Sequence, residues 1–260
     1  MVHIASPQPS EQVLSAFNAS MSQPEKMSAA WDYGWRMSDV VFARATDIAA
    51  WSAKLRLKLD VPGARVVRPM RATDGRFVVG GWKANHHVPG ELSKRVDETA
   101  ALALRWDEVM LEQQEQVPQR DDVFAQAEEI AWKETGEGYQ ELPANRPLVI
   151  GHADLLGTTI YSGSKPPTIV DVIPTAAPRP KGYSAALVIV DGLIAAACDD
   201  GICDRFAHVP SIDQLLLRAV AYRRHVNNLH PESKSYTVHI LKGLKSICCP
   251  VSMRQWMHES

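Results

Sequence analysis

Two aspartates follow short apolar segments near the middle of the sequence. Asp154 ends a Gly-His-Ala-Asp turn directly after residues 148–150, Leu-Val-Ile, and Asp171 comes directly after residues 168–170, Thr-Ile-Val. Such β-branched and apolar runs are typical of short buried strands, where a carboxylate is seldom left without a charged partner. We therefore expect a polar loop between two strands, with one carboxylate at each strand, that holds a metal ion and a proton acceptor side by side.

These two carboxylates suit phosphoryl transfer, which needs a divalent ion on the phosphate oxygens and a carboxylate near the attacking hydroxyl. Asp154 fits the second role, because it would accept the proton or orient the hydroxyl. Asp171 fits the role of Mg²⁺ ligand, because magnesium prefers oxygen ligands and takes only one or two protein carboxylates. A metal-dependent hydrolase is an alternative, since His152 and Asp154 would share one face of a strand.

The same residues carry a resemblance to a known superfamily. His152 and Asp154, followed by Thr159 five residues after the aspartate and then by Asp171, resemble the catalytic loop and metal-binding strand of aminoglycoside phosphotransferases and choline kinases. Residues 68–82, RPMRATDGRFVVGGW, resemble an actinobacterial branch of that superfamily. The resemblance implies a protein-kinase-like fold, ATP and Mg²⁺ as cofactors, and phosphate transfer to a hydroxyl of a small-molecule substrate.

The resemblance also implies roles for residues of the loop. Thr159, or Thr158 if the loop is one residue shorter, takes the place of the second metal ligand, which is an Asn in the family. A threonine hydroxyl binds Mg²⁺ in P-loop enzymes, but it is a weaker ligand than a carbonyl oxygen. His152 would be structural, because its ring would hydrogen-bond to backbone and hold the loop in shape.

On the nucleotide side, the resemblance places Gly80, Gly81 and Trp82 at the hinge whose backbone receives the adenine. Glycines let the chain approach a flat ligand closely. The alternative is that Gly80 and Gly81 form only a bend.

Three features depart from the family pattern. The family's lysine is absent from residues 40–45, where Ala43 or Arg44 stands in its place, and residues 48–59 contain no glutamate to hold it. Arg44 would bind the phosphates, although Arg and Lys are not interchangeable at such a site. The expected phosphate-covering loop has a single glycine, Gly34. A kinase-like protein that binds a nucleotide or a partner without transferring phosphate is therefore the main alternative to an active phosphotransferase.

The elements around these residues alternate in type along the chain. We expect strands at residues 31–36, 39–45, 65–70 and 76–82, and helices at 11–17, 47–59, 91–115, 123–133, 185–198 and 211–228. Asp74-Gly75 predicts a hairpin between the third and fourth strands. The order indicates an α+β protein of two lobes: residues 1–84 with a sheet and one helix, a hinge near residues 80–89, and a helical lobe of residues 85–260 that contains the catalytic-type loop 148–174.

The predicted helices carry further expectations. In helix 47–59 the basic side chains should face solvent. In helix 123–133, Phe124 and Ile130 should face the core. Asp191, inside an otherwise apolar helix, should have an arginine partner. Residues 223–225, Arg-Arg-His, should form a polar face, and residues 236–260 contain one more possible helix.

Composition excludes several classes of function. The net charge of about −2 provides no basic surface for nucleic acid, and no segment approaches the roughly 20 apolar residues of a membrane helix. The first 18 residues do not resemble a signal peptide, so we expect a cytoplasmic protein with four reduced cysteines. A zinc site made of Cys198, Cys203 and His208 is a minor alternative, because it lacks a second ligand pair. No residue identifies the small-molecule substrate.

Overall fold

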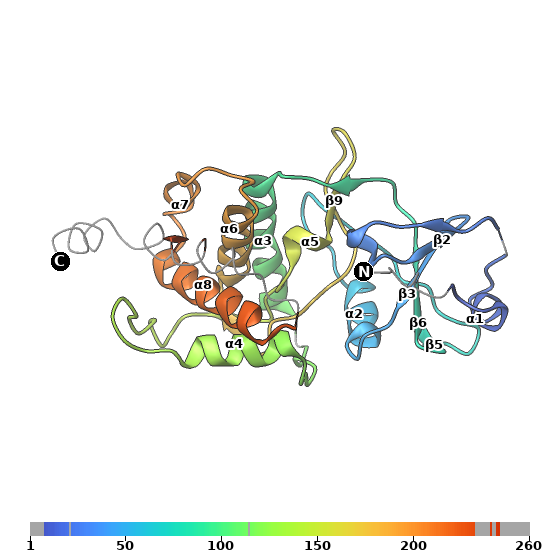
Figure 1. Cartoon of the computed structure of the whole chain (residues 1–260), viewed down its shortest axis with the longest axis horizontal. Coiled ribbons are helices and arrows are strands. Elements are labelled where there is room, and N and C mark those ends of the chain that lie inside the picture. The colour runs from blue at the N-terminus through green and yellow to red at the C-terminus, as the bar shows by residue number, and fades with distance from the viewer. Residues whose placement is uncertain (1–7, 21, 114, 232–239, 241–242, 245–260) are drawn as a thin grey trace. The chain divides into compact units, whose positions relative to one another are not determined.

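The computed structural model describes residues 8–20, 22–113, 115–231, 240 and 243–244. The chain forms two compact units. Unit 1 consists of Met1–Ser93 and Gly157–Ile173, and unit 2 of Lys94–Leu156 and Pro174–Ser260. The division falls at Ser93 where residue 84 was predicted, and the segment after the Asp154 loop groups with unit 1. The predicted α+β class is confirmed, with an antiparallel sheet toward the N-terminus and mainly helices after it (Figure 1).

Unit 1 is built on a five-stranded sheet in which all neighbouring strands are antiparallel. In spatial order its strands are β1 (Glu25–Lys26), β2 (Trp35–Met37), β3 (Val40–Arg44), β6 (Trp82–His86) and β5 (Val78–Val79). The centre is the β3–β6 pair, where Phe42 lies opposite Ala84 and Ala43 opposite Lys83. Because opposite residues share one face of a sheet, this register decides which side chains meet on each side.

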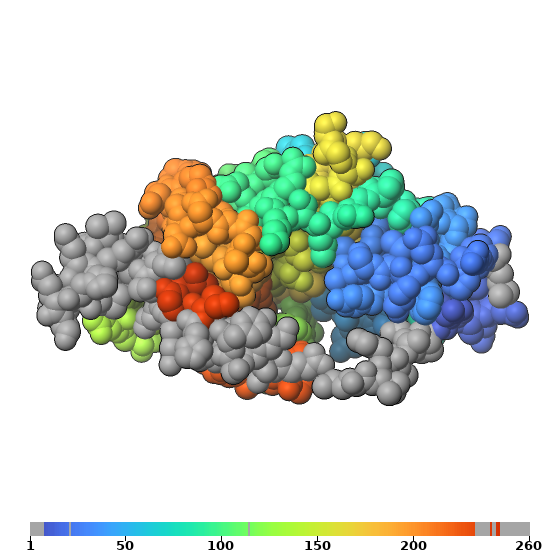
Figure 2. Space-filling view, turned by 45° about the horizontal axis from the view of Figure 1, so that its top comes forward, coloured from blue at the N-terminus to red at the C-terminus, as the bar shows by residue number. Residues whose placement is uncertain are grey.

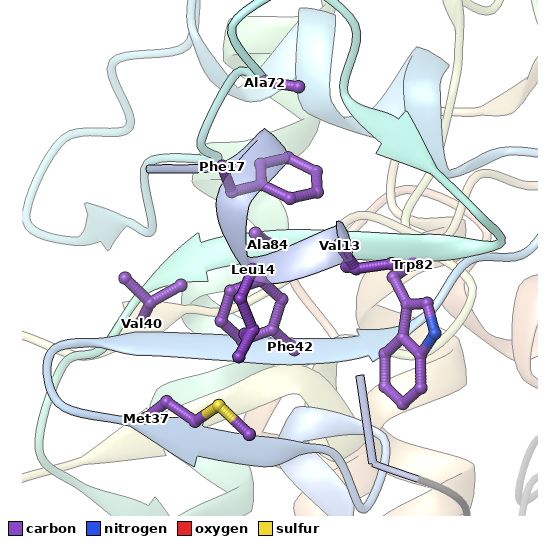
Figure 3. Packing of buried hydrophobic residues seen from close by; sticks show 9 residues of the cluster. All are labelled: Val13, Leu14, Phe17, Met37, Val40, Phe42, Ala72, Trp82 and Ala84. Carbon is purple, nitrogen blue, oxygen red and sulfur yellow. The ribbon is translucent and has the colours of Figure 1, made fainter. Parts of the chain in front are cut away.

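Helix α1 (Glu11–Ala16) covers one face of this sheet (Figure 3). It begins at Ser10, whose hydroxyl accepts the N–H of Val13 at 3.4 Å, as the side chain of an N-cap residue does. Phe17 packs edge-on against Phe42 of β3, with ring centroids 5.9 Å apart. The buried apolar side chains of this cluster are Val13, Leu14, Phe17, Met37, Val40, Phe42, Ala72, Trp82 and Ala84.

The predicted Asp74-Gly75 hairpin is wrong. Strand β5 pairs with β6 through a tight turn at Gly80 and Gly81, whose φ angles are +57° and +76°. A two-residue hairpin of this kind requires positive φ at both central residues, which glycine adopts without strain. Asp74 makes only a local turn, in which its Oδ1 accepts the N–H of Arg76 at 3.0 Å.

A second, four-stranded sheet completes unit 1. Its strands, in spatial order, are β4 (Arg65–Val66), β10 (Thr168–Ile169), β9 (Thr159–Tyr161) and β7 (Glu91–Leu92). Strand β4 therefore pairs in parallel with β10 rather than with β5. The turn between β9 and β10, which contains Gly163 and Lys165, is exposed, and this hairpin protrudes at the surface (Figure 2).

Helix α2 (Ala49–Arg56) follows β3, and its buried face differs from the predicted one. The expectation that its basic side chains all face solvent is wrong for Arg56, which is only 3% exposed. Lys54 is exposed as predicted. Arg56 is buried because it forms an ion pair with Asp171.

Unit 2 is mainly helical. Its main helices are α3 (Val96–Glu112), α4 (Val123–Lys133), α6 (Tyr183–Ile194), α7 (Ile202–Arg205) and α8 (Ile212–Leu229). Helix α6 packs against α3 and α8, and α8 packs against α4 (Figure 1). A short antiparallel pair, β8 (Leu148–Val149) with β11 (Arg179–Pro180), leads into the Asp154 loop, and helix α5 (Leu155–Thr158) follows that loop.

Two helical predictions in unit 2 need correction. Phe124 and Ile130 of α4 are 42% and 41% exposed, although both were expected to face the core. Glu128 takes an inward position instead and is 1% exposed, because Arg179 neutralises it at 2.6 Å. The expected arginine partner of Asp191 is confirmed as Arg223, at 2.6 Å, so Arg223 does not belong to a solvated face.

No described helix combines the length and hydropathy that a membrane-spanning segment requires. Neither Cys198 nor Cys203 forms a disulfide bond within the described residues. The helix considered for residues 236–260 lies outside the described residues, apart from positions 240, 243 and 244.

Candidate functional site

Asp171 lies just after β10 in unit 1, and donors surround its carboxylate. Its Oδ1 accepts hydrogen bonds from the Ser52 hydroxyl at 2.5 Å and from the backbone N–H of Val172 at 2.8 Å. Its Oδ2 accepts from the ammonium of Lys83, and Nε of Arg56 lies 3.5 Å from Oδ1. A charged partner was expected for a carboxylate at a buried strand end, and Asp171 has two of them, Lys83 and Arg56.

Lys83 provides a lysine where the sequence pattern predicted none. The strand register pairs it with Ala43, the position at which the superfamily's lysine was expected. Its side chain is 8% exposed, and its ammonium binds Asp171 and also Oδ2 of Asp32, at 2.6 Å. The neighbouring strand β6 thus supplies a buried ammonium on the same face as the missing β3 lysine.

Helix α2 contacts Asp171 directly, in place of the glutamate that it lacks. Ser52 and Arg56 stand four residues apart and so share one face of the helix. The guanidinium of Arg56 also donates to the carbonyl oxygens of Val67 at 3.1 Å and Val170 at 2.9 Å. Arg56 therefore fixes α2 to the strand that carries Asp171.

Asp32 reaches Lys83 from a strained turn between β1 and β2. Asp32 and Tyr33 have φ angles of 52° and 50°, and a left-handed conformation costs a non-glycine residue about 1–2 kcal/mol. A Cβ at the next residue, Gly34, would lie 2.3 Å from the carbonyl oxygen of Phe42, so the close packing of this turn on β3 requires glycine. The Asp32 side chain itself remains 53% exposed.

The four charges of this cluster balance. Burial would raise the pKa of Asp171, but the cations Lys83 and Arg56 hold that pKa well below its usual range. Burial would lower the pKa of Lys83, but Asp171 and Asp32 together raise it. Two cations thus face two carboxylates, and without Asp32 the remaining three groups would carry one net positive charge.

As arranged, these residues do not fit Mg²⁺. Magnesium demands near-octahedral oxygen ligands at about 2.0–2.1 Å, whereas both oxygens of Asp171 already accept from protein donors. Thr159, the predicted second ligand, lies opposite Ile169 in the β9–β10 ladder. Its hydroxyl is buried and has no hydrogen-bond partner in the described part of the chain. The predicted metal roles of Asp171 and Thr159 therefore require Lys83 to leave Oδ2.

The metal-dependent alternatives find no geometric support. Within the described ranges, no three His, Cys, Asp or Glu side chains gather as metal ligands. This applies to the hydrolase site proposed around His152 and to the zinc site proposed around Cys198.

Asp154 lies in unit 2, at the end of a turn that begins after β8. The ring of His152 is fully buried and packs edge-on against Trp106, with centroids 5.2 Å apart. Its Nδ1 accepts the backbone N–H of Asp154 at 3.2 Å, which is the ring-to-backbone contact predicted for it. Nδ1 is therefore unprotonated in this arrangement, and the ring sets the shape of the loop.

The buried carboxyl group of Asp107 supports the same loop through hydrogen bonds. The backbone N–H of His152 donates to the Ser184 hydroxyl at 2.9 Å, and that hydroxyl donates to Oδ1 of Asp107 at 2.7 Å. The N–H of Gly182 donates to the other oxygen of Asp107 at 2.6 Å. Burial raises the pKa of Asp107 to about 7, although these two donors oppose the rise. The loop that carries Asp154 is thus tied to helices α3 and α6.

The predicted nucleotide-binding residues Arg44, Gly80, Gly81 and Trp82 lie together at one end of the β3–β6 pair. The Arg44 guanidinium stacks 4.4 Å from the Trp82 ring centroid. Trp82 is 4% exposed and belongs to the apolar cluster under α1. Gly80 and Gly81 form the β5–β6 turn, which agrees with the alternative that these two residues form a bend. A role for these four residues in binding a nucleotide stays a prediction.

Four residues of the Asp171 cluster were missed: Asp32, Ser52, Arg56 and Lys83. One signal for Lys83 was available, because Lys83 and Asn85 alternate with the apolar Trp82 and Ala84 in a central strand. A lysine at such a position must find a carboxylate partner.

Comparisons with known proteins return a likeness to solved structures but not to a family model. No family model matches the chain, and no curated protein matches it. Among solved structures, it is similar to spectinomycin phosphotransferase, APH(9)-Ia, in complex with ADP and spectinomycin. The TM-score is 0.49 and the sequence identity 10%, and the match covers 83% of this chain and 87% of that chain. At this level of similarity, no conclusion about the ligands or activity of this chain follows.

Proposed function

We propose that the chain is a kinase-like protein that binds the phosphates of a nucleotide at Lys83 and needs no divalent ion to do so. The observation that carries this proposal is the position of the Lys83 ammonium, between the carboxylates of Asp171 and Asp32. A cationic group held between two carboxylates occupies the place that a metal ion takes in a metal-dependent site.

Asp32 is the group that a phosphate would replace. Its side chain is the most exposed of the four, at 53%, and its turn is held in a left-handed conformation. A phosphate carries more negative charge than a carboxylate and offers three acceptor oxygens. If a phosphate displaced Asp32, Asp171 would still hold Lys83. The phosphate oxygens would then accept the hydrogen bonds that the Lys83 ammonium had donated to Asp32.

The same arrangement argues against phosphate transfer. Transfer requires a divalent ion on the phosphate oxygens to neutralise the negative charge that develops in the transition state. The Lys83 ammonium supplies only a single positive charge. Lys83 also occupies the carboxylate oxygen that a metal ion would use. Of the functions inferred from the sequence, the binding protein without transfer is therefore the one that this geometry supports best.

An active small-molecule phosphotransferase is the second candidate, and the Asp154 loop favours it. A plain surface turn does not need the buried Asp107–Ser184–His152 chain of hydrogen bonds, whereas a catalytic carboxylate needs such positioning. Asp154 would then accept the proton of the substrate hydroxyl. Asp171 would serve the metal only after Lys83 had released it.

Calorimetric titration of ATP, once with EDTA and once with Mg²⁺, separates the two candidates. We expect ATP to bind in EDTA, Lys83→Met to lose that binding, and Lys165→Met, at an exposed lysine of the same unit, to retain it. Because loss of Lys83 could unfold unit 1, Asp32→Asn is the second variant, and it should bind ATP more tightly. Binding in no condition, or no response of either variant, would overturn the proposal. ADP formation that needs Mg²⁺ and is lost in Asp154→Asn would establish the second candidate.

A further inference from the structure

Unit 2 contains a cavity of about 440 Å³ that three arginines line: Arg146, Arg179 and Arg218. Arg146 stands in the loop before β8, Arg179 in β11 and Arg218 in α8. None of these arginines belongs to the Asp154 loop or to its hydrogen-bonded supports.

Aromatic rings order two of the three guanidinium groups. Arg179 lies 4.6 Å and Arg218 5.2 Å from the ring centroid of Trp132, which also lines the cavity. Arg218 lies in addition 5.5 Å from the ring of Tyr139. Stacked guanidiniums of this kind are held in place with their charge intact.

Within the described residues, one of the three arginines has a carboxylate at ion-pair distance. Arg179 is paired with Glu128 at 2.6 Å. Arg146 donates to the carbonyl oxygen of Lys181 at 2.7 Å, and Arg218 donates to the carbonyl oxygen of Gln140 at 3.3 Å. Over the described ranges of the chain, neither Arg146 nor Arg218 forms an ion pair with a carboxylate.

Both unpaired arginines are also partly withdrawn from water. Arg218 is 9% exposed, and burial lowers the pKa of Arg146 and of Arg218. An arginine nevertheless stays charged in a protein, so each guanidinium is a partly desolvated cation; for Arg146, the Asp107 carboxyl opposes the lowering of the pKa. In addition, each of the three arginines has one buried N–H nitrogen without a hydrogen-bond partner among the described residues. Partly desolvated charge without an ion-pair partner is costly, and a bound anion would offset that cost.

The other lining residues define the rest of the ligand. Glu141 is the acidic residue of the lining, so three arginines face two carboxylates when Glu128 is included, and one positive charge remains. Leu148, which is 59% exposed, and neighbouring prolines give the cavity an apolar side. A ligand that fits has one anionic group and an apolar body.

We propose that this cavity binds a small organic anion, a carboxylate or a phosphate monoester with an apolar or aromatic body. Arg146 and Arg218 bind the anionic group, and Trp132 and Leu148 contact the body. The site is separate from the nucleotide phosphates assigned to Lys83, and it does not depend on that assignment.

Calorimetric titration of the full chain with phenyl phosphate and with benzoate tests the proposal, and phenol serves as the neutral probe. We expect at least one of the two anions to bind and phenol not to bind. Binding of phenyl phosphate alone identifies a phosphate site, and binding of benzoate alone identifies a carboxylate site. Binding of phenol as tight as that of the anions, or binding of none of the probes, would overturn the proposal.

Variants locate the site. Arg146→Gln should weaken binding of the anion by roughly tenfold or more, because one charged hydrogen-bond donor is lost. Arg218→Gln should do the same, with circular dichroism to establish that it is folded. The matched control is Arg76→Gln, at an arginine of unit 1 whose side chain is 67% exposed. Equal losses of anion affinity in Arg76→Gln and Arg146→Gln would show that the attraction is nonspecific and would contradict the proposal.

Discussion

The ammonium of Lys83 lies 2.6 Å from Oδ2 of Asp32 and also binds Oδ2 of Asp171, so one buried lysine joins an exposed turn to a buried strand end. Removal of Asp171 and removal of Asp32 should have different consequences for Lys83. Asp171 is 14% exposed and anchors the lysine, whereas Asp32 is 53% exposed and can leave it. Under the proposed function, a ligand with greater negative charge takes the place of Asp32, and Asp171 remains the anchor of Lys83.

Asp32→Asn tests this difference between the two carboxylates. The change removes the competing negative charge and leaves one net positive charge on Lys83, Arg56 and Asp171. Because half-exposed ion pairs contribute up to about 1 kcal/mol, ATP affinity in EDTA should rise by roughly fivefold. Asp39→Asn, at an exposed aspartate that follows β2 in the chain, is the control and should leave affinity unchanged. A weaker affinity in Asp32→Asn would mean that Asp32 supports the ligand rather than competes with it.

Arg56→Met should destabilise the protein strongly. The side chain is 1% exposed and donates to two backbone carbonyls as well as facing Asp171. Breaking a buried ion pair on one side typically costs about 3–5 kcal/mol, because the remaining charge stays buried. Lys54→Met, at an exposed position of the same helix, should change the free energy of unfolding by less than about 0.5 kcal/mol. Urea denaturation of both variants measures this, and equal midpoints would show that Arg56 is dispensable.

Local signals predicted the helices better than they predicted pairing. Helix α4 spans Val123–Lys133, the predicted range, because Asp122 accepts the N–H groups of Phe124 and Ala125 and so fixes its start. The β5–β6 hairpin was missed since Asp74-Gly75 and Gly80-Gly81 are both good turn sequences. Nothing local says which strand will pair across a turn, because pairing depends on contacts distant in the sequence.

The carboxylates of the candidate site could be read from the sequence, but their partners could not. Asp171 stood out because it interrupts an apolar run. Lys83 joins it from 88 positions away and Ser52 from 119 positions away. A basic residue on a helix looks solvated in the sequence, so Arg56 could not be distinguished from Lys54 without the fold.

Asp107 should make the stability of the protein depend on pH. Its pKa is raised by burial to about 7 in the folded state, so the folded protein binds a proton that the unfolded chain releases at a lower pH. This contribution is complete below about pH 4 and is lost as pH rises to about 7, and it corresponds to at most roughly 4 kcal/mol. Asp107→Asn should be flatter over that range in unfolding measured by urea, since Asn cannot titrate. Glu112→Gln, at an exposed position of α3, is the control, and a variant profile parallel to wild type would contradict the prediction.

Gly34→Ala should show that the Asp32 turn depends on its contact with β3. A Cβ at this position would lie 2.3 Å from the carbonyl oxygen of Phe42 and 3.0 Å from that of Trp31, and neither backbone atom can move without shifting a strand or a turn. Gly163→Ala is the matched control, because its φ of +57° is strained for alanine but nothing lies within 4 Å of the added Cβ.

The control should therefore cost about 1 kcal/mol, from backbone strain alone, while Gly34→Ala should cost about 2–3 kcal/mol or more, as overpacking of a rigid site does. The same displacement should move Asp32 away from Lys83, so the variant should also bind ATP in EDTA with altered affinity, which Gly163→Ala should not. If both substitutions gave the same loss of stability and the same affinity, the turn would have room to relax. Asp32 would then be placed by its ion pair with Lys83 rather than by the backbone of the turn.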